Sequence, residues 1–398
     1  MTGTAGAAGV VALYAVILAR FLVPLAIPRF PVPGLVASLV LDAVDQTIFQ
    51  QFPGLDIAGY QQYDKALDIY YLTIAYASTL RNWTDPFAFG IARFLFYYRL
   101  VGVLVFELAD QQWLLLVFPN TFEYFFLAYE LVRTRWAPVR LGHRALLRLA
   151  AGIWVVIKLP QEYWLHVAEL DVTDEVRTRV LGVGLDDGWG AAVANRPWVL
   201  LVVAVVVVAL GVGWRRGVVP RLPAQDWPPG FDVDERARGG EIRTVPASVR
   251  ARQSAFVRGP LLEKIALVSI VSVVFAQIVP GVRATDTQVV LTVAVVVVLN
   301  SVVSHWVAGR GAQWRSTVGQ FLAVSAINAG IVLALVVLPT PGGARVDVPA
   351  ALFFLLLLSL LVTLYDRYRM LRQLRRRRGQ LPLQWRRARA RFRAQVGS

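Results

Sequence analysis

Residues 42–68 read DAVDQTIFQQFPGLDIAGYQQYDKALD, and this polar stretch decides how the rest of the chain is interpreted. It carries five aspartates, five glutamines and one lysine, although the flanking sequence is strongly apolar. Charged side chains are rare inside a bilayer because burying them there costs free energy, and those that occur usually serve a function. The stretch therefore marks where we expect a polar site in a membrane-embedded chain.

The composition indicates a membrane protein built from helices. The chain has 398 residues, of which 57% are hydrophobic, and its mean hydropathy is +0.54. Runs such as 198–214 and 350–365 are close to the length that crosses about 30 Å of hydrocarbon as a helix. We therefore predict an all-α fold, a polytopic transmembrane helical bundle.

Eleven segments are apolar enough to be spans. The third, 60–80, is the weakest, because Asp64, Lys65 and Asp68 lie in its first half, and it can instead be a re-entrant or buried helix. The first lacks a basic n-region and a small-residue cleavage site, so we expect it to be retained. The spans are expected at 8–27, 33–52, 60–80, 88–108, 112–132, 145–166, 198–214, 260–279, 286–307, 316–337 and 349–366.

The arginines predict the orientation. With the C-terminus inside, seventeen arginines fall in the expected inner loops and five in the outer loops. Cytoplasmic loops carry an excess of basic residues. An odd number of spans then gives an N-out/C-in topology. The excess of arginine over lysine is typical of a bacterial GC-rich genome, which favours the plasma (inner) membrane as the location.

The same analysis divides the chain. We predict that the two bundles are separate and that the cytoplasmic linker is the most mobile long connection. The expected parts are a polar-lined N-terminal bundle of six spans (1–167), an acidic extracytoplasmic loop (168–197), a linking span (198–214), a basic cytoplasmic linker (215–259), an apolar four-span bundle (260–367) and a basic cytoplasmic tail (368–398).

Three predictions concern partners. The lipid bilayer surrounds the spans, and the arginine-rich tail contacts the anionic inner leaflet. The segment 260–366 is apolar with few polar residues, so its surface is a candidate face for a partner membrane protein. The net charge of +15 comes from arginines in loops, where orientation requires them, so we expect no nucleic-acid partner.

Polar residues recur at helical spacing in five neighbouring spans. Residues three or four apart share a helix face, and lipid cannot satisfy such groups, so these faces should meet one another or a wet cavity. The stripes are Asp42, Asp45, Gln46 and Gln50; Gln61, Asp64, Lys65 and Asp68; Arg93, Tyr97 and Glu107; Asn120, Glu123 and Glu130; and Lys158, Glu162 and His166.

Depth places part of these stripes in one layer. At 1.5 Å per residue, the layer lies ~12–14 Å below the outer surface. Its members are expected to be Asp45, Asp68, Arg99, Asn120 and Lys158. In one interpretation they only pair, Asp68 with Lys158 or Arg99 with Asp45, and so fix helix register.

In the other interpretation the layer is a site. Catalytic roles then fall to Asp45, Asp64 and Asp68, as general base or metal ligand. Arg99 and Lys158 would hold an anion, with Asn120, Glu162 and His166 also contacting substrate.

The identity of a metal is open. The carboxylates at 42, 45, 64 and 68 suit Mg²⁺, and Glu162 with His166 has the spacing of a divalent-metal pair. Cysteine is absent, which excludes thiolate metal sites and disulfides. There is no P-loop, dinucleotide fingerprint, serine elbow or HExxH motif, and the acidic spacings match neither prenyltransferases nor CDP-alcohol transferases.

Three functions remain open. The first is an enzyme or binding protein for an amphiphilic, anionic or lipid-linked substrate at the outer face, which needs an opening onto the carboxylates. The second is a proton- or cation-coupled transporter, which needs a path inward past Arg93 and Glu130. The third is a non-catalytic assembly subunit, which needs neither.

Overall fold

Every element in the described part of the chain is a helix, which confirms the all-α prediction. Three of these helices are long and apolar enough to cross a membrane: Ala7–Ala26, Pro86–Ala109 and Trp198–Arg221. The expected spans 286–307 and 316–337 lie wholly or mostly outside the described residues. This computed structural model describes residues 7–49, 52, 60–109, 111–166, 168, 175–184, 189–236, 258–278, 321–322, 325–326, 329–330 and 348–377.

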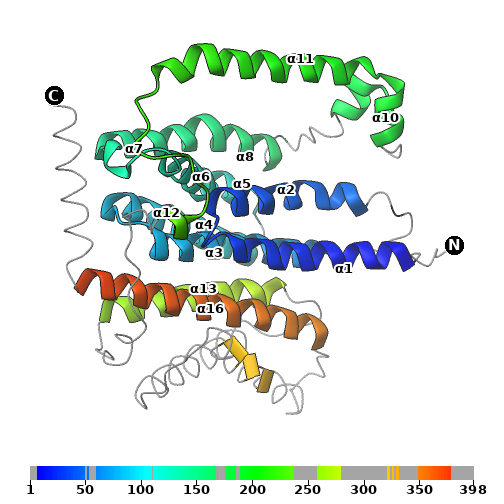
Figure 1. Cartoon of the computed structure of the whole chain (residues 1–398). Coiled ribbons are helices and arrows are strands. Elements are labelled where there is room, and N and C mark those ends of the chain that lie inside the picture. The colour runs from blue at the N-terminus through cyan, green and yellow to red at the C-terminus, as the bar shows by residue number, and fades with distance from the viewer. Residues whose placement is uncertain are drawn as a thin grey trace.

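The chain begins with a tight helical hairpin. Helix α1 (Ala7–Leu22) continues into the short η1 (Val23–Ala26), and α2 (Pro31–Phe49) returns beside it (Figure 1). Gly34 allows this approach, because a Cβ there would lie 2.8 Å from the backbone nitrogen of Ile27. The hairpin therefore brings the polar face of α2 against α1.

Helix α3 (Tyr60–Asn82) is the centre of the molecule. Every residue from 69 to 80 is buried. Its 23 residues rise about 34 Å at 1.5 Å per residue, which is enough to cross a bilayer core. The hydroxyls of Thr73, Ser78 and Thr79 donate to carbonyls three or four residues earlier, at 2.7–2.8 Å, so their burial leaves no hydroxyl proton unbonded. The weakest expected span is thus the helix on which the others pack.

Two breaks in the following helices have local causes. Helix α4 (Pro86–Ala109) starts where the Asp85 carboxylate accepts the Phe87 N–H at 2.8 Å, with proline in the first turn. The expected span 112–132 is broken at Pro119, because α5 (Trp113–Val117) ends before it and α6 (Thr121–Arg133) starts after it.

The expected span 145–166 is continuous but irregular. After the short η2 (Pro138–Arg140), α7 (His143–Gly152) widens into the π-helix η3 (Ile153–Lys158) and then narrows into α8 (Leu159–His166). Pro160 has no N–H to donate to the preceding turn, and a widened turn accommodates that loss.

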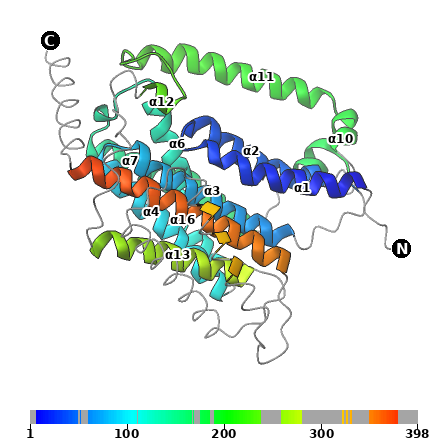
Figure 2. The same ribbon diagram turned by 60° about the horizontal axis from the view of Figure 1, so that its bottom comes forward.

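Helix α11 (Trp198–Gly213) runs along the outside of the bundle in both views (Figures 1 and 2). None of its residues is buried. Trp198 begins α11 and Trp214 directly follows it, at the two levels where headgroups would lie. The shorter elements around it are η4 (Val176–Leu181), α10 (Trp189–Asn195), η5 (Trp214–Val218), η6 (Val219–Arg221) and α12 (Val233–Arg236).

Helices α13 (Arg258–Ile278) and α16 (Val348–Arg377) pack on α3 and α4 and share their hydrophobic core. The Tyr63 ring of α3 stacks on Phe354 of α16 at 5.8 Å. This packing departs from the expected division into two separate bundles. The physical reason is that residues 69–80 of α3 are buried on every face, and α16 covers a side of α3 that α2, α4 and α6 do not.

Residues 222–236, here called the acidic strap, bind the loops at one end of the bundle. Arg140 pairs with Asp226 at 2.6 Å and Arg29 with Asp232 at 2.8 Å, and Arg81 pairs with Asp234. Four segments that are expected in the cytoplasm therefore meet at one end, named the basic end. The strap is attached, which departs from the mobile linker expected over 215–259; residues 237–257 of that linker lie outside the described residues.

Candidate functional site

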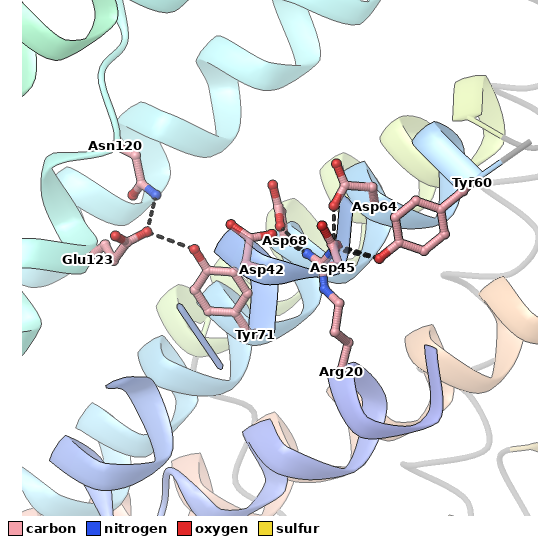
Figure 3. A network of polar contacts seen from close by, with 9 residues as sticks. All are labelled: Arg20, Asp42, Asp45, Tyr60, Asp64, Asp68, Tyr71, Asn120 and Glu123. Atoms are coloured by element: carbon pink, nitrogen blue, oxygen red, sulfur yellow. Dashed lines mark hydrogen bonds and ion pairs between the residues drawn. The ribbon is translucent and has the colours of Figure 1, made fainter. Parts of the chain in front are cut away.

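The guanidinium of Arg20 lies at the centre of four carboxylates, the Arg20 cluster (Figure 3). Arg20 comes from α1. The carboxylates are two residues of α2, three positions apart, and two of α3, four positions apart, so each pair shares a helix face. Arg20 Nη1 lies 2.5 Å from Asp45 and Nη2 lies 2.7 Å from Asp68. It also pairs with Asp42 and Asp64.

The base of the cluster is closed. The side chains of Arg20 and Asp45 are only 3% and 2% exposed. The Tyr60 hydroxyl donates to Asp45 Oδ2 at 2.5 Å and accepts from Arg20 Nη1 at 2.9 Å. Asp45 is therefore fully engaged, and its geometry fits a positioning role better than the general-base role predicted for it.

The other side of the cluster is open. The side chains of Asp42, Asp64 and Asp68 are 32%, 28% and 41% exposed. One oxygen from each lies within 4.8 Å of the others. Four carboxylates face one guanidinium, so the cluster carries excess negative charge when ionised. This donor set suits a hard cation such as Mg²⁺, with Arg20 bound at the Oδ1 atom of each of the three carboxylates.

A second polar group adjoins the cluster. Tyr71 follows Asp68 by three residues on α3, and its hydroxyl donates to Glu123 Oε2 at 2.7 Å. The same oxygen accepts from Asn120 Nδ2 at 2.6 Å (Figure 3). Asn120 is buried and its Oδ1 has no hydrogen-bond partner in the described structure. An unsatisfied buried acceptor costs free energy, so this atom is a natural contact for a bound donor.

Lys158 and Glu162 extend this group. The Lys158 side chain is buried, and its ammonium lies 4.1 Å from the centre of the Tyr124 ring. Glu162 accepts the backbone N–H of Asn120 at 3.4 Å. The structure thus places Asn120 beside Glu162, with Lys158 four residues before Glu162 in the same continuous helix, whereas the side chain of His166 lies outside the described part.

The predicted ion pairs are wrong. Asp68 pairs with Arg20 instead of Lys158, and Asp45 also pairs with Arg20 instead of Arg99. Arg99 Nη1 donates to the carbonyl of Phe118 at 3.0 Å. The physical reason is that α1 supplies a guanidinium whose several N–H donors bind multiple carboxylates at once.

Aromatic side chains fill the bundle between the site and the basic end. Tyr76 stacks on Phe96 with ring centres 4.4 Å apart, and farther along α3 the Trp83 ring lies 4.2 Å from that of Tyr129. Beyond them Glu130 is fully buried and accepts from Trp83 Nε1 at 2.6 Å. The predicted stripe of Asn120, Glu123 and Glu130 is therefore divided between two places.

The stripe on α4 does not reach the site either. Arg93 lies 4.0 Å from Glu263 of α13, and the Tyr97 hydroxyl donates to the Glu263 carbonyl at 3.3 Å. Glu107 pairs with the half-exposed Lys65 at 3.1 Å. Of the α2 and α3 stripes, the side chains of Gln46, Gln50 and Gln61 lie outside the described residues.

The sequence analysis missed Arg20, Tyr60 and Tyr71. Arg20 did carry a signal, because it is the one charged residue of an apolar helix and such a charge needs a carboxylate partner. The two tyrosines carried none: Tyr60 begins a helix, and tyrosine is common at span ends, whereas Tyr71 lies among apolar and aromatic residues in the middle of α3. No protein-family model, no curated protein and no solved structure matches the chain, so its function has to be argued from this geometry.

Proposed function

We propose that the chain is a multi-pass protein of a bacterial plasma membrane, with up to eleven spans and an N-out/C-in topology. Three apolar helices of sufficient length support a membrane location. The gathering of Arg29, Arg81 and Arg140 at one end supports the alternation of loops. With that orientation the basic end is cytoplasmic.

We further propose that the polar site handles an amphiphilic, anionic or lipid-linked substrate and opens to the outer face. One observation carries this proposal. The carboxylates of Asp42, Asp64 and Asp68 are partly exposed on one side. On the other side, aromatic rings fill the interior of the bundle between the cluster and Glu130. An opening on one side without a path through the bundle is what a binding or catalytic site needs.

The charge balance restricts how an anion binds. Because carboxylates outnumber cations in the Arg20 cluster, a phosphate would be repelled unless a cation came with it. Asp42, Asp64 and Asp68 would hold that cation, and a bound divalent ion would supply Lewis-acid activation. Asn120 Oδ1 and the Lys158 ammonium would contact the polar part of the substrate, and Tyr71 would hold Glu123 in place.

Proton- or cation-coupled transport is the second candidate. It is favoured by the charge imbalance and by the four clustered carboxylates, since acidic side chains inside a membrane form proton relays in pumps. It requires the aromatic side chains to open toward Glu130. A non-catalytic subunit is the third, and for it the exposed α11 would be a contact surface.

Cation binding tests the proposal. Purified full-length chain is titrated with Mn²⁺, and bound ion is followed by electron paramagnetic resonance. We expect Asp64→Asn and Asp68→Asn to lose the bound signal. Asp234→Asn is the matched control, because it removes a partly exposed carboxylate that also pairs with an arginine, at the basic end.

The same preparations separate the three functions. We expect Mn²⁺ to increase the retention of polyprenyl phosphate in wild type but not in Asp64→Asn. Proton or sodium flux in vesicles that depends on Asp68, without such retention, would establish transport instead. Absence of both activities, with the fold intact, would leave the subunit role.

A further inference from the structure

A groove of about 440 Å³ follows α4, and no residue of the Arg20 cluster lines it. Gly90, Phe94, Tyr98 and Val101 line it at the spacing of one helix face, and Phe118 stands at its far end. At 1.5 Å per residue, the stretch from 90 to 101 is ~16 Å long. Because α4 is long and apolar enough to cross a membrane and Phe94 in the groove is exposed, the groove would face lipid in a bilayer.

Two glycines give the groove its shape. A Cβ at Gly90 would meet nothing within 4 Å, so that end is open. A Cβ at Gly102 would lie 2.1 Å from the Cβ of Phe118, so only glycine lets Phe118 lie against the helix and close the other end. The Tyr98 hydroxyl, which donates to the Val117 carbonyl at 2.8 Å, fixes this arrangement.

The groove has a positive charge near its open end. Arg93 lines it, and the Arg93 side chain is 52% exposed. Its nearest carboxylate, Glu263, is 4.0 Å away and already pairs with Arg369 at 3.0 Å. Glu263 therefore offsets the charge of Arg93 only in part, and an anion at this position would gain a charge-assisted contact.

The position of Arg93 along α4 lets its side chain reach toward the lipid headgroups. It lies seven residues after Pro86, which at 1.5 Å per residue is ~10 Å from the basic end. A long arginine side chain at that depth extends toward the headgroup layer. The apolar part of the groove then extends from Arg93 toward the middle of the bilayer.

We propose that this groove binds one anionic phospholipid, with its phosphate at Arg93 and an acyl chain along Phe94, Tyr98 and Val101. Charge complementarity favours an anionic headgroup over a zwitterionic one, and the aromatic walls fit a chain. The site is separate from the Arg20 cluster, so it stands whether or not the proposed function is correct.

Lipid retention tests the proposal. The full chain is purified in mild detergent, incubated with phosphatidylglycerol or phosphatidylcholine, and examined by native mass spectrometry. We expect wild type to retain one phosphatidylglycerol in preference to phosphatidylcholine. Arg93→Gln should lower the retention of phosphatidylglycerol several-fold and abolish the preference. Gly90→Leu fills the groove and should lower the retention of both lipids.

Two controls make the result decisive. Arg148→Gln removes an exposed arginine of α7 and should retain lipid as wild type does. Gly90→Ala adds one methyl group and should also retain lipid, so a loss that tracks side-chain volume is distinguished from misfolding. Unchanged retention in Gly90→Leu, or equal losses in Arg93→Gln and Arg148→Gln, would overturn the proposal.

Discussion

The guanidinium of Arg20 and the carboxylate of Asp68 lie 2.7 Å apart although 48 positions separate them in the chain. This pair links α1 to α3 across α2. Removing one partner of a fully buried pair costs about 3–5 kcal/mol; Arg20 is buried but Asp68 is partly exposed, so solvent screening makes the cost of removing Asp68 smaller.

The first prediction follows from this pair. Arg20→Gln should destabilise the protein more than any single aspartate variant of the cluster, because it leaves four carboxylates without a counterion. Arg20→Lys should recover only part of the loss, since an ammonium cannot reproduce the planar fork. Thermal unfolding in detergent measures both.

A double-mutant cycle checks the partner assignment. Arg20→Gln with Asp68→Asn should cost less than the sum of the two single changes. Lys158→Gln with Asp68→Asn should be additive. Coupling of Asp68 to Lys158 rather than to Arg20 would contradict the structure.

The second prediction concerns topology. Because the chain has no cysteine, single cysteines at Thr178 and Ala224 can be labelled without background. Both positions are exposed, and the N-out/C-in arrangement places them on opposite sides of the membrane. An impermeant thiol reagent applied to intact cells should therefore react at 178 and not at 224. Reaction at both positions from one side would refute the assignment.

The third prediction concerns the acidic strap. The hydrogen bond from Arg140 lowers the pKa of Asp226 in the folded protein. An acid with a lowered folded pKa contributes stability above its unfolded pKa of about 3.9, and this contribution disappears as the pH falls through the folded value. Asp226→Asn should therefore melt at lower temperature than wild type at pH 7, and the difference should vanish at acidic pH.

Hydrogen exchange locates that effect. The N–H of Asp226 donates to the Arg135 carbonyl and that of Val233 to the Arg29 carbonyl, each at 3.0 Å. These amides should exchange slowly in wild type and faster in Asp226→Asn, while those of α3 stay protected. Rapid exchange of the strap in wild type would show that it is not attached.

The fourth prediction concerns the start of α4. Burial raises the pKa of Asp85, so its charged form costs free energy that its hydrogen bond to Phe87 N–H partly offsets. Asp85→Ala loses the cap and should cost about 1 kcal/mol. Asp85→Asn keeps an acceptor without a charge and should be at least as stable as wild type at pH 7. A group whose folded pKa is raised loses stability as the pH rises from its unfolded pKa through its folded pKa, so this advantage should shrink as the pH falls through the raised pKa of Asp85 and should be gone below about pH 3.9.

The part of the site that follows helical spacing could be predicted from the sequence. The pairs Asp42–Asp45 and Asp64–Asp68 each lie on one helix face because 3.6 residues make a turn, and the structure joins both pairs. The break at Pro119 follows from a missing N–H. These features depend only on residues close together in the chain.

What depended on packing between helices could not be predicted. The spacing around Asp68 does not distinguish Arg20 from Lys158 as its partner. Which of the two cations lies next to Asp68 depends on how α1 is rotated about its axis, and the sequence does not show that rotation. Likewise, the apolar residues of the strap have neither helical nor strand periodicity. The sequence therefore held no pattern from which its attachment through Asp226 could be predicted. The cover of α3 by α16 depends on the shape of both surfaces.

That cover has a consequence for biosynthesis. Helix α3 leaves the ribosome early, whereas α16, the helix that shields one of its sides, begins at Val348. At ~5–20 residues per second, the intervening stretch of roughly 270 residues takes on the order of 13–53 s to synthesise. Throughout that interval the nascent α3 exposes a face that includes Tyr63, which stacks on Phe354 in the finished protein. Until α16 is made, another surface, such as a chaperone, the translocon or lipid, must cover that face.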